Sequence, residues 1–175
     1  RFPVQTVIRP QGIDLHDFRG YAGTVAGGIF RVGDEVKVLP SGFASKIKSI
    51  NVYDKFEEMA FEGMSVVLTL TDDIDISRGD MIVKSNNLPE ITQDLSAMIC
   101  WFNENPARDR AKYTLKHTSN EPKAMIKEIE YKVNIDTIKR IEDDKQIHMN
   151  DICKVKIRTT APIMMDDYAR NRKTG

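Results

Sequence analysis

The sequence predicts an all-β protein, and residue usage, side-chain periodicity and the spacing of turn signals all point to this fold class. The 175 residues include 19 Ile and 12 Val but only 7 Leu and 10 Ala. β-Branched side chains pack well on pleated sheets, whereas Leu and Ala predominate in helical proteins. Short apolar stretches alternate with turn sequences along most of the chain. Many short, closely spaced strands indicate small barrels or sandwiches.

The first half of the chain carries six predicted strands, each a short run rich in β-branched or aromatic residues. They cover residues 4–8, 21–25, 35–39, 46–52, 65–70 and 81–83. The turn sequences Val32-Gly33-Asp34 and Pro40-Ser41-Gly42 flank the third of them. Glycine and proline adopt the backbone angles that tight turns need, so these positions are expected to reverse the chain.

Four further strands are predicted in the second half, at residues 97–102, 113–118, 125–135 and 153–157. From Met125 to Ile135 the odd positions are mostly apolar, while Glu128, Glu130 and Lys132 lie between them. Residues 153–157 show the same two-residue alternation. This period is that of a strand with one buried and one solvated face.

A polar stretch at residues 84–89 divides the two halves. We therefore predict a first β-barrel at residues 1–86, a linker at 87–92 and a second barrel at 93–175. Residues 1–92 carry 10 basic and 13 acidic side chains, whereas residues 93–175 carry 16 and 13. The opposite charge of the two halves fits two neighbouring domains.

Composition and motifs exclude several function classes. The 26 basic and 26 acidic residues leave no basic excess, which argues against a general nucleic-acid binder. No apolar run approaches the roughly 18 residues of a membrane span. The chain begins at Arg1 without an initiator Met or a signal-peptide pattern, so we expect a cytoplasmic fragment of a longer protein. The only cysteines, Cys100 and Cys153, lie far apart and predict neither a zinc site nor a redox pair.

The sequence also lacks the motifs of a catalytic or cofactor site. There is no G-x-x-x-x-G-K-[ST] phosphate loop and no G-x-S-x-G nucleophile elbow. The acidic run 72–80 resembles a calcium loop, but Arg78 and Lys84 occupy positions that such a loop needs for Gly and Glu. We therefore predict no catalytic residue, no bound cofactor and no metal ligand in this chain.

One basic cluster is open to two interpretations. Lys116 and His117 lie in a predicted hairpin, and Arg108 and Arg110 come shortly before it. Together these side chains could bind phosphate or an acidic partner. Alternatively, they form an ordinary solvated face on which His117 caps a turn.

The segment 23–36, with the sequence GTVAGGIFRVGDEV, resembles the second domain of translation-factor GTPases. This signature marks a fold shared by elongation and initiation factors more than a function. Further segments restrict the resemblance to one family within this group. They are FPVQ (2–5), FRGYAG (18–23), VLPSG (38–42), DIDISRGD (73–80), LKHT (115–118), Trp101 and the segment 168–175 with Asn171-Arg172. Together these segments resemble the large, GTP-dependent subunit of bacterial sulfate adenylyltransferase.

The resemblance implies that the chain forms two barrels like the second and third domains of elongation factor Tu. GTP and magnesium would then bind in an N-terminal GTPase domain that this chain lacks. A smaller catalytic subunit would bind ATP and make adenylyl sulfate and pyrophosphate from ATP and sulfate, driven by GTP hydrolysis. The chain itself would be non-catalytic, within a parent that is an enzyme. This sequence departs from the family around Gly12–Asp17, where inserted residues are expected to lengthen the first loop. The family also continues past a Thr-Gly like Thr174-Gly175 into another apolar strand, and without that strand the second barrel would have an open edge.

Two alternatives remain open, namely an RNA-binding barrel pair of a translation factor and an autonomous protein-binding module. If the chain does belong to the sulfate adenylyltransferase subunit, the candidate contacts with the catalytic subunit or the GTPase domain are polar or aromatic residues within the segments that resemble the family. They are Arg19 and Tyr21 in the first barrel and Lys116, His117 and Arg172 in the second.

Overall fold

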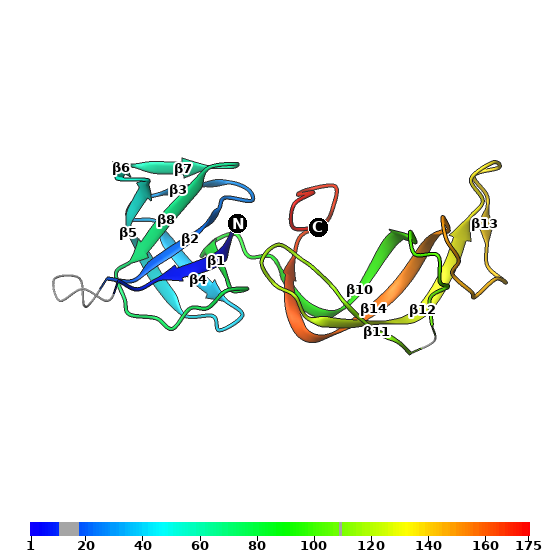
Figure 1. The fold of residues 1–175 in the computed structure, drawn as a ribbon. Coiled ribbons are helices and arrows are strands. Elements are labelled where there is room, and N and C mark those ends of the chain that lie inside the picture. The colour runs from blue at the N-terminus through cyan, green and yellow to red at the C-terminus, as the bar shows by residue number, and fades with distance from the viewer. Residues whose placement is uncertain (11–17, 109) are drawn as a thin grey trace. The chain divides into compact units, whose positions relative to one another are not determined.

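The computed structural model describes residues 1–10, 18–108 and 110–175, and every regular element in this part of the chain is a β-strand (Figure 1). The predicted all-β fold class is confirmed. The lengthened loop expected around Gly12–Asp17 lies outside the described residues. Within the described ranges there is no helix that could cross a membrane.

Contacts within the chain define two compact units. The first unit comprises Arg1–Ile91, Lys116–Glu121 and Ile163–Gly175, and the second comprises Thr92–Leu115 and Pro122–Pro162. The chain therefore returns twice from the second unit to the first, once at a short turn and once at its C-terminal end. The division predicted from the sequence, at residues 87–92, stays a prediction.

Six strands of the first unit form a closed barrel, because β4 pairs both with β9 at one end of the strand order and with β5 at the other. Its strands are β1 (Phe2–Ile8), β2 (Gly20–Thr24), β4 (Glu35–Leu39), β5 (Ala44–Val52), β8 (Ser65–Leu70) and β9 (Met81–Lys84). A short strand, β6 (Lys55–Glu57), pairs antiparallel with the end of β5, and β3 (Ile29–Arg31) pairs with β7 (Met59–Phe61) as a separate ribbon. A closed barrel leaves no unpaired edge among its six strands.

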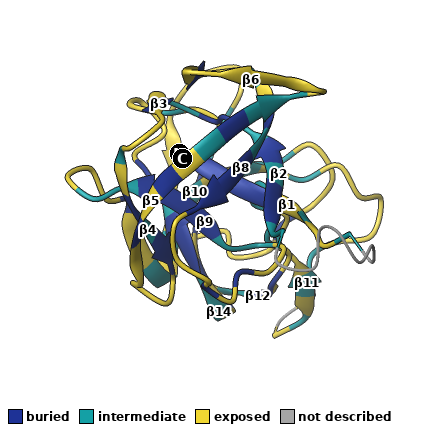
Figure 2. Ribbon diagram, turned by 90° about the vertical axis from the view of Figure 1, so that its left-hand side faces the viewer, coloured by how far each residue is buried: buried dark blue, intermediate teal, exposed yellow. Residues whose placement is uncertain are grey.

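The barrel interior is filled by alternate residues of these strands. On β4, Val36 and Val38 are fully buried while Glu35 is exposed. Sixteen buried apolar residues form one continuous core in this unit. Figure 2 shows buried positions along β8 and β9. On β9 the consecutive residues Met81, Ile82 and Val83 are all buried, because Ile82 lies in the main core and its two neighbours pack in a second apolar cluster.

The second unit is built on an open sheet with the strand order β10-β14-β12-β11, in which β13 pairs with β12. Its strands are β10 (Glu90–Cys100), β11 (Lys112–Thr114), β12 (Lys123–Val133), β13 (Arg140–Ile141) and β14 (Ile152–Met165). Cys153 and Val155 are fully buried on β14, as the alternation predicted. The core is smaller than that of the first unit, with five buried residues and a larger set of partly buried ones.

The structure corrects the predicted face of β12. Its pairing with β14 shifts register twice, between Ile126 and Glu128 and between Ile129 and Tyr131. Each irregularity interrupts the alternation of inward and outward side chains. After the second shift Lys132 pairs with the buried Cys153, on the same face as Ile129, so this residue, which the period placed on the solvated face, is only 4% exposed.

Other differences arise where strands are very short or a turn intervenes. The strands β3, β6, β7 and β13 have only two or three residues each, too few to show a period. The strand expected at 113–118 ends at Thr114, because residues 117–120 form a tight turn in which Thr118 has a φ of 54°. The strand expected at 97–102 instead begins at Glu90 and ends at Cys100.

Candidate functional site

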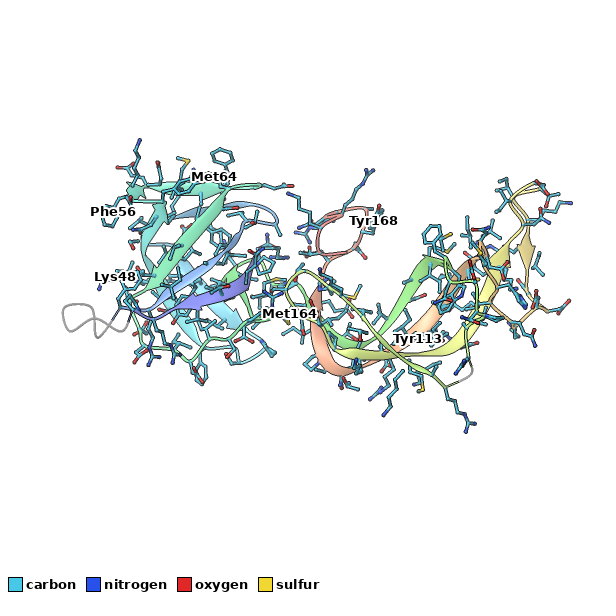
Figure 3. The ribbon with its side chains drawn as sticks, viewed as in Figure 1. Lys48, Phe56, Met64, Tyr113, Met164 and Tyr168 are labelled. Carbon is cyan, nitrogen blue, oxygen red and sulfur yellow. The ribbon has the colours of Figure 1, made fainter. Side chains whose placement is uncertain are left out.

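The C-terminal segment Ile163–Gly175 packs against the barrel of its own unit. Met164, labelled in Figure 3, is 2% exposed and lies in an apolar cluster with Leu39, Met81 and Val83. Leu39 and Met81 are paired residues of β4 and β9. The last residues of the chain are therefore fixed to the barrel at its β4–β9 ladder.

A buried ion pair joins the first residue of the chain to this segment. The Arg1 guanidinium donates from Nε to Asp166 Oδ2 at 2.8 Å and from Nη2 to Oδ1 at 2.6 Å, and both residues are 8% exposed. Thr174 Oγ1 donates a third hydrogen bond to Asp166 Oδ2, at 2.7 Å. The hydrogen bonds from Arg1 lower the pKa of Asp166; burial opposes this shift, and the bond from Thr174 adds to it.

A cleft of about 520 Å³ lies beside this pair, within the first unit. It is bounded by the β2–β3 turn, the end of β9 and the loop 167–174, on which Tyr168 is labelled in Figure 3. Its charged lining consists of five cationic and two acidic side chains: Arg1, Lys84, Arg170, Arg172 and Lys173 against Glu62 and Asp166.

The loop reaches the β2–β3 turn through Asn171. Its Nδ2 donates to the carbonyl oxygen of Ala26 at 3.1 Å, and a Cβ atom on Gly27 would lie 2.7 Å from this nitrogen. A side chain at Gly27 would therefore displace the Asn171 amide and disturb its hydrogen bond to Ala26.

The cations of the cleft differ in how far they are neutralised. Lys84 Nζ pairs with Asp34 and Lys173 Nζ with Glu62, each at 3.0 Å and each partly exposed to solvent. Arg170 Nη2 reaches Asn87 Oδ1 at 3.5 Å, and the Arg172 guanidinium lies 5.9 Å from the centroid of the Tyr168 ring. Among the described residues, neither of these arginines has a carboxylate within ion-pair distance.

Of the predicted contact residues, Arg172 lies on this cleft, and Arg19 forms an ion pair with Asp73 elsewhere on the first unit. Tyr21 is 1% exposed and donates from its hydroxyl to the carbonyl oxygen of Ile74 at 3.0 Å. It is part of the barrel core, so its ring presents no surface to a partner.

The predicted basic cluster is divided between the two units. Lys116 and His117 belong to the first, whereas Arg108 and Arg110 belong to the second. Lys116 is exposed. His117 pairs with Asn120 across the turn, and its ring Nε2 lies 3.0 Å from the carbonyl oxygen of Thr174.

Sequence reasoning missed a buried ion pair and a buried lysine. The partners Arg1 and Asp166 are 165 residues apart, and no local pattern connects them. Lys132 donates from Nζ to Asp144 and Asp151, each at 2.7 Å, inside a strand that the alternation assigned to solvent. The run Arg170-Asn171-Arg172-Lys173 does carry a visible signal, three cations in four residues. In the part of the chain that the structure describes, no three His, Cys, Asp or Glu side chains are placed to hold a metal ion.

Comparison with known proteins matches the whole chain to one group of proteins. Sulfate adenylyltransferase subunit 1 of Sulfurovum sp. is 43% identical over 183 residues, and that of Bacteroides thetaiotaomicron is 40% identical over the same length. Each match covers 100% of this chain and 37% of the relative. The chain is a homologue of sulfate adenylyltransferase subunit 1.

Other relatives and structures agree with this assignment. The bifunctional enzyme CysN/CysC of Mycobacterium tuberculosis is 43% identical over 179 residues, and the match covers 100% of this chain and 29% of that enzyme. Residues 94–175 match the family described as GTP-eEF1A C-terminal domain-like. The crystal structure of Sup35 complexed with GDP superposes with a TM-score of 0.87 over 99% of this chain and 42% of Sup35, at 14% identity. The subunit 1 homologue therefore has two β-sheet domains of the translation-factor type, as the sequence predicted, and spans about a third of the length of its relatives.

Proposed function

We propose that the chain forms the non-catalytic β-domains of the GTP-dependent subunit of sulfate adenylyltransferase. In this proposal they couple GTP hydrolysis to the cytoplasmic conversion of ATP and sulfate into adenylyl sulfate and pyrophosphate. The observation that carries the proposal is 40–43% identity along the whole chain to relatives named sulfate adenylyltransferase subunit 1. GTP and magnesium bind in a separate GTPase domain of the parent, and ATP binds in the catalytic small subunit.

The proposed mechanism is mechanical. A closed barrel with a continuous core resists deformation, because its interior is densely packed and all six strands are paired. Such a barrel transmits a change of state in a GTPase domain by moving as one body rather than by deforming. The catalytic subunit senses this movement through its contacts with the β-domains.

The first test is whether this 175-residue chain migrates with the catalytic subunit of sulfate adenylyltransferase on a sizing column. We expect a complex, which identifies a docking surface on the β-domains. If none forms, the same run with the full-length parent, with and without GTP, decides whether docking needs the GTPase domain. Absence of a complex with the full-length parent as well would refute the proposal.

We further propose that Arg19, Lys116, His117 and Arg172 contact the partner or the GTPase domain, without Tyr21, whose side chain is buried. The charge reversals Lys116→Glu and Arg172→Glu test this. Since both side chains are exposed, we expect weaker partner binding, mainly through slower association, and an unchanged melting temperature.

The matched control for these reversals is Lys55→Glu, at an exposed lysine on β6. It carries the same charge change outside the proposed contact set and should leave binding unaltered. A fall in melting temperature for Lys116→Glu or Arg172→Glu would instead assign these residues a structural role.

A further inference from the structure

The cleft on the first unit is a local concentration of positive charge in a protein without net charge. The whole chain has 26 basic and 26 acidic residues, yet the cleft is lined by five cationic and only two acidic side chains. Arg1 and Asp166 neutralise one another in their buried ion pair, which leaves four cationic side chains and one acidic side chain in the lining. Concave basic sites attract anions more strongly than convex ones, because the low-dielectric walls focus the field.

Two arginines in the cleft retain their capacity to bind an anion. Arg170 and Arg172 contact only an amide oxygen and an aromatic ring in the interactions described above. Lys84 and Lys173 are held in ion pairs with partly exposed partners, and pairs of this kind contribute little, so these lysines can turn toward a stronger anion. Arg1 is fully engaged with Asp166 and Asn87 and serves the wall of the cleft rather than a ligand.

We propose that this cleft binds a compound carrying two or more linked phosphate groups. Its volume of about 520 Å³ lies in the range of small-molecule sites and exceeds what a single phosphate or sulfate ion fills. Guanidinium groups match phosphate oxygens with paired N–H donors, and linked phosphates bring several charges into a small volume. The cations come from two separate segments, the end of β9 and the loop 167–174, so an extended anion can contact both at once.

This proposal extends beyond the coupling function and does not depend on it. An acidic protein segment is the competing occupant. It carries one charge per side chain, spaced along a backbone, whereas linked phosphates bring several charges into a small volume, which makes a compact polyphosphate the better match. The inference rests on the charges, partners and volume of the cleft alone.

Isothermal titration of the 175-residue chain tests the proposal, with tripolyphosphate, pyrophosphate, orthophosphate and sulfate as ligands, in magnesium-free buffer at low salt. We expect affinity to rise with the number of linked phosphates and to weaken as salt is added, since exposed charges are screened. A parallel titration with a nucleoside triphosphate shows whether the linked phosphates of the ligand belong to an inorganic chain or to a nucleotide. Equal affinity with tripolyphosphate supports an inorganic chain as the ligand, and higher affinity supports a nucleotide.

The variants Arg170→Gln and Arg172→Gln should each weaken tripolyphosphate binding about tenfold, the loss expected for one charge-assisted contact. Lys112→Gln removes an exposed cation on β11 in the other unit and should leave binding unchanged. Melting temperatures show whether each variant is folded; both arginines are exposed, and we expect no change.

Three results would overturn the proposal. The first is an equal affinity for orthophosphate and tripolyphosphate. The second is an equal loss of binding in Lys112→Gln and in the cleft variants. The third is tighter binding of a poly-glutamate peptide than of tripolyphosphate, which would identify the cleft as a site for an acidic protein segment.

Discussion

Individual buried side chains hold the two ends of the first unit together. Arg1 begins β1's segment and Asp166 follows β14, and their bidentate ion pair is almost fully removed from solvent. A buried pair of this kind is satisfied only while both partners are present, because a lone buried charge loses its solvation without compensation. Both residues of the pair also line the basic cleft, so the same contact contributes to the stability of the unit and to the shape of the cleft.

We predict that Asp166→Asn destabilises the first unit by about 3–5 kcal/mol at neutral pH, since it leaves the Arg1 guanidinium buried without a counter-charge. The pKa of Asp166 is lowered from 3.8, so its contribution is present above that pH and is lost as pH falls through the lowered value. The wild type should therefore approach the variant in stability toward pH 2.

Denaturant titrations at pH 7 and at low pH, followed at amide signals of β2 and β8, measure this difference. Asp167→Asn, at the exposed neighbouring position, is the matched control and should have little effect at either pH. A destabilisation by Asp166→Asn that stays the same at low pH would contradict the ionic origin of the effect.

At the scale of the element, local irregularities decide which side chains a strand buries. The register shift of β12 between Ile129 and Tyr131 places Lys132 opposite the buried Cys153, and Asp144 and Asp151 accept its hydrogen bonds. Burial works to lower the pKa of Lys132, but the bonds to both carboxylates outweigh it and leave the pKa raised. The lysine stays charged and ties the segment after β13 to the strand.

Lys132→Ala should destabilise the second unit by about 1–3 kcal/mol, because it removes a buried side chain and leaves the half-buried Asp151 without its donor. Lys156→Ala, which removes an exposed lysine paired with Glu128 on the same sheet, is the control and should have little effect. Denaturant midpoints of the second unit, followed by Trp101 fluorescence, give the comparison. Equal midpoints for the two variants would show that the buried contacts contribute no more than the exposed pair.

The close approach of the backbones of β1 and β2 leads to a second prediction about the strands. A Cβ atom on Gly23 would collide with the carbonyl oxygen of Pro3 on the paired strand. Gly23→Ala should therefore cost about 1–3 kcal/mol, the range for an overpacked interior. Gly42→Asn is the control, because Gly42 has a φ of +81° with open space around it and Asn tolerates this conformation. Thermal melting of both variants checks this, and a stable Gly23→Ala would mean that β1 can shift away from β2.

At the scale of the molecule, the two units differ in how their sheets end. The first is a closed barrel with sixteen buried core residues, and the second is an open sheet with five. Local opening is easier where few apolar contacts must be broken and where strands lie at an edge. The first unit also receives the turn Lys116–Glu121 and the C-terminal segment, which add to its contacts.

We expect amide hydrogen exchange to follow this difference. The amides of β5 and β8 in the closed barrel should exchange at least about tenfold more slowly than those of β11, a three-residue edge strand of the second unit. Mass spectrometry of peptides covering these strands measures the rates. Similar protection of β11 and β8 would show that the second sheet is as stable as the barrel.

Much of this protein follows from its sequence. Residue usage and period two predicted the all-β class, and several strands, such as 35–39 and 65–70, have the bounds that the structure shows. Both strands belong to the closed barrel, where each of them has a paired neighbour on both sides. Short sequence segments spread along the chain also indicated the relationship to sulfate adenylyltransferase subunit 1 that the comparisons establish.

Only the tertiary structure decided where charges are buried and which distant residues meet. The bulge in β12 between Ile129 and Tyr131 places Lys132 on the same face as Ile129, and Tyr21, which sequence reasoning placed on the surface, lies in the barrel core. Arg1 and Asp166 come together because the chain returns from the second unit to the β4–β9 ladder. Periodicity describes neighbours within a strand, whereas the cleft and its ion pair depend on contacts between segments far apart in the chain.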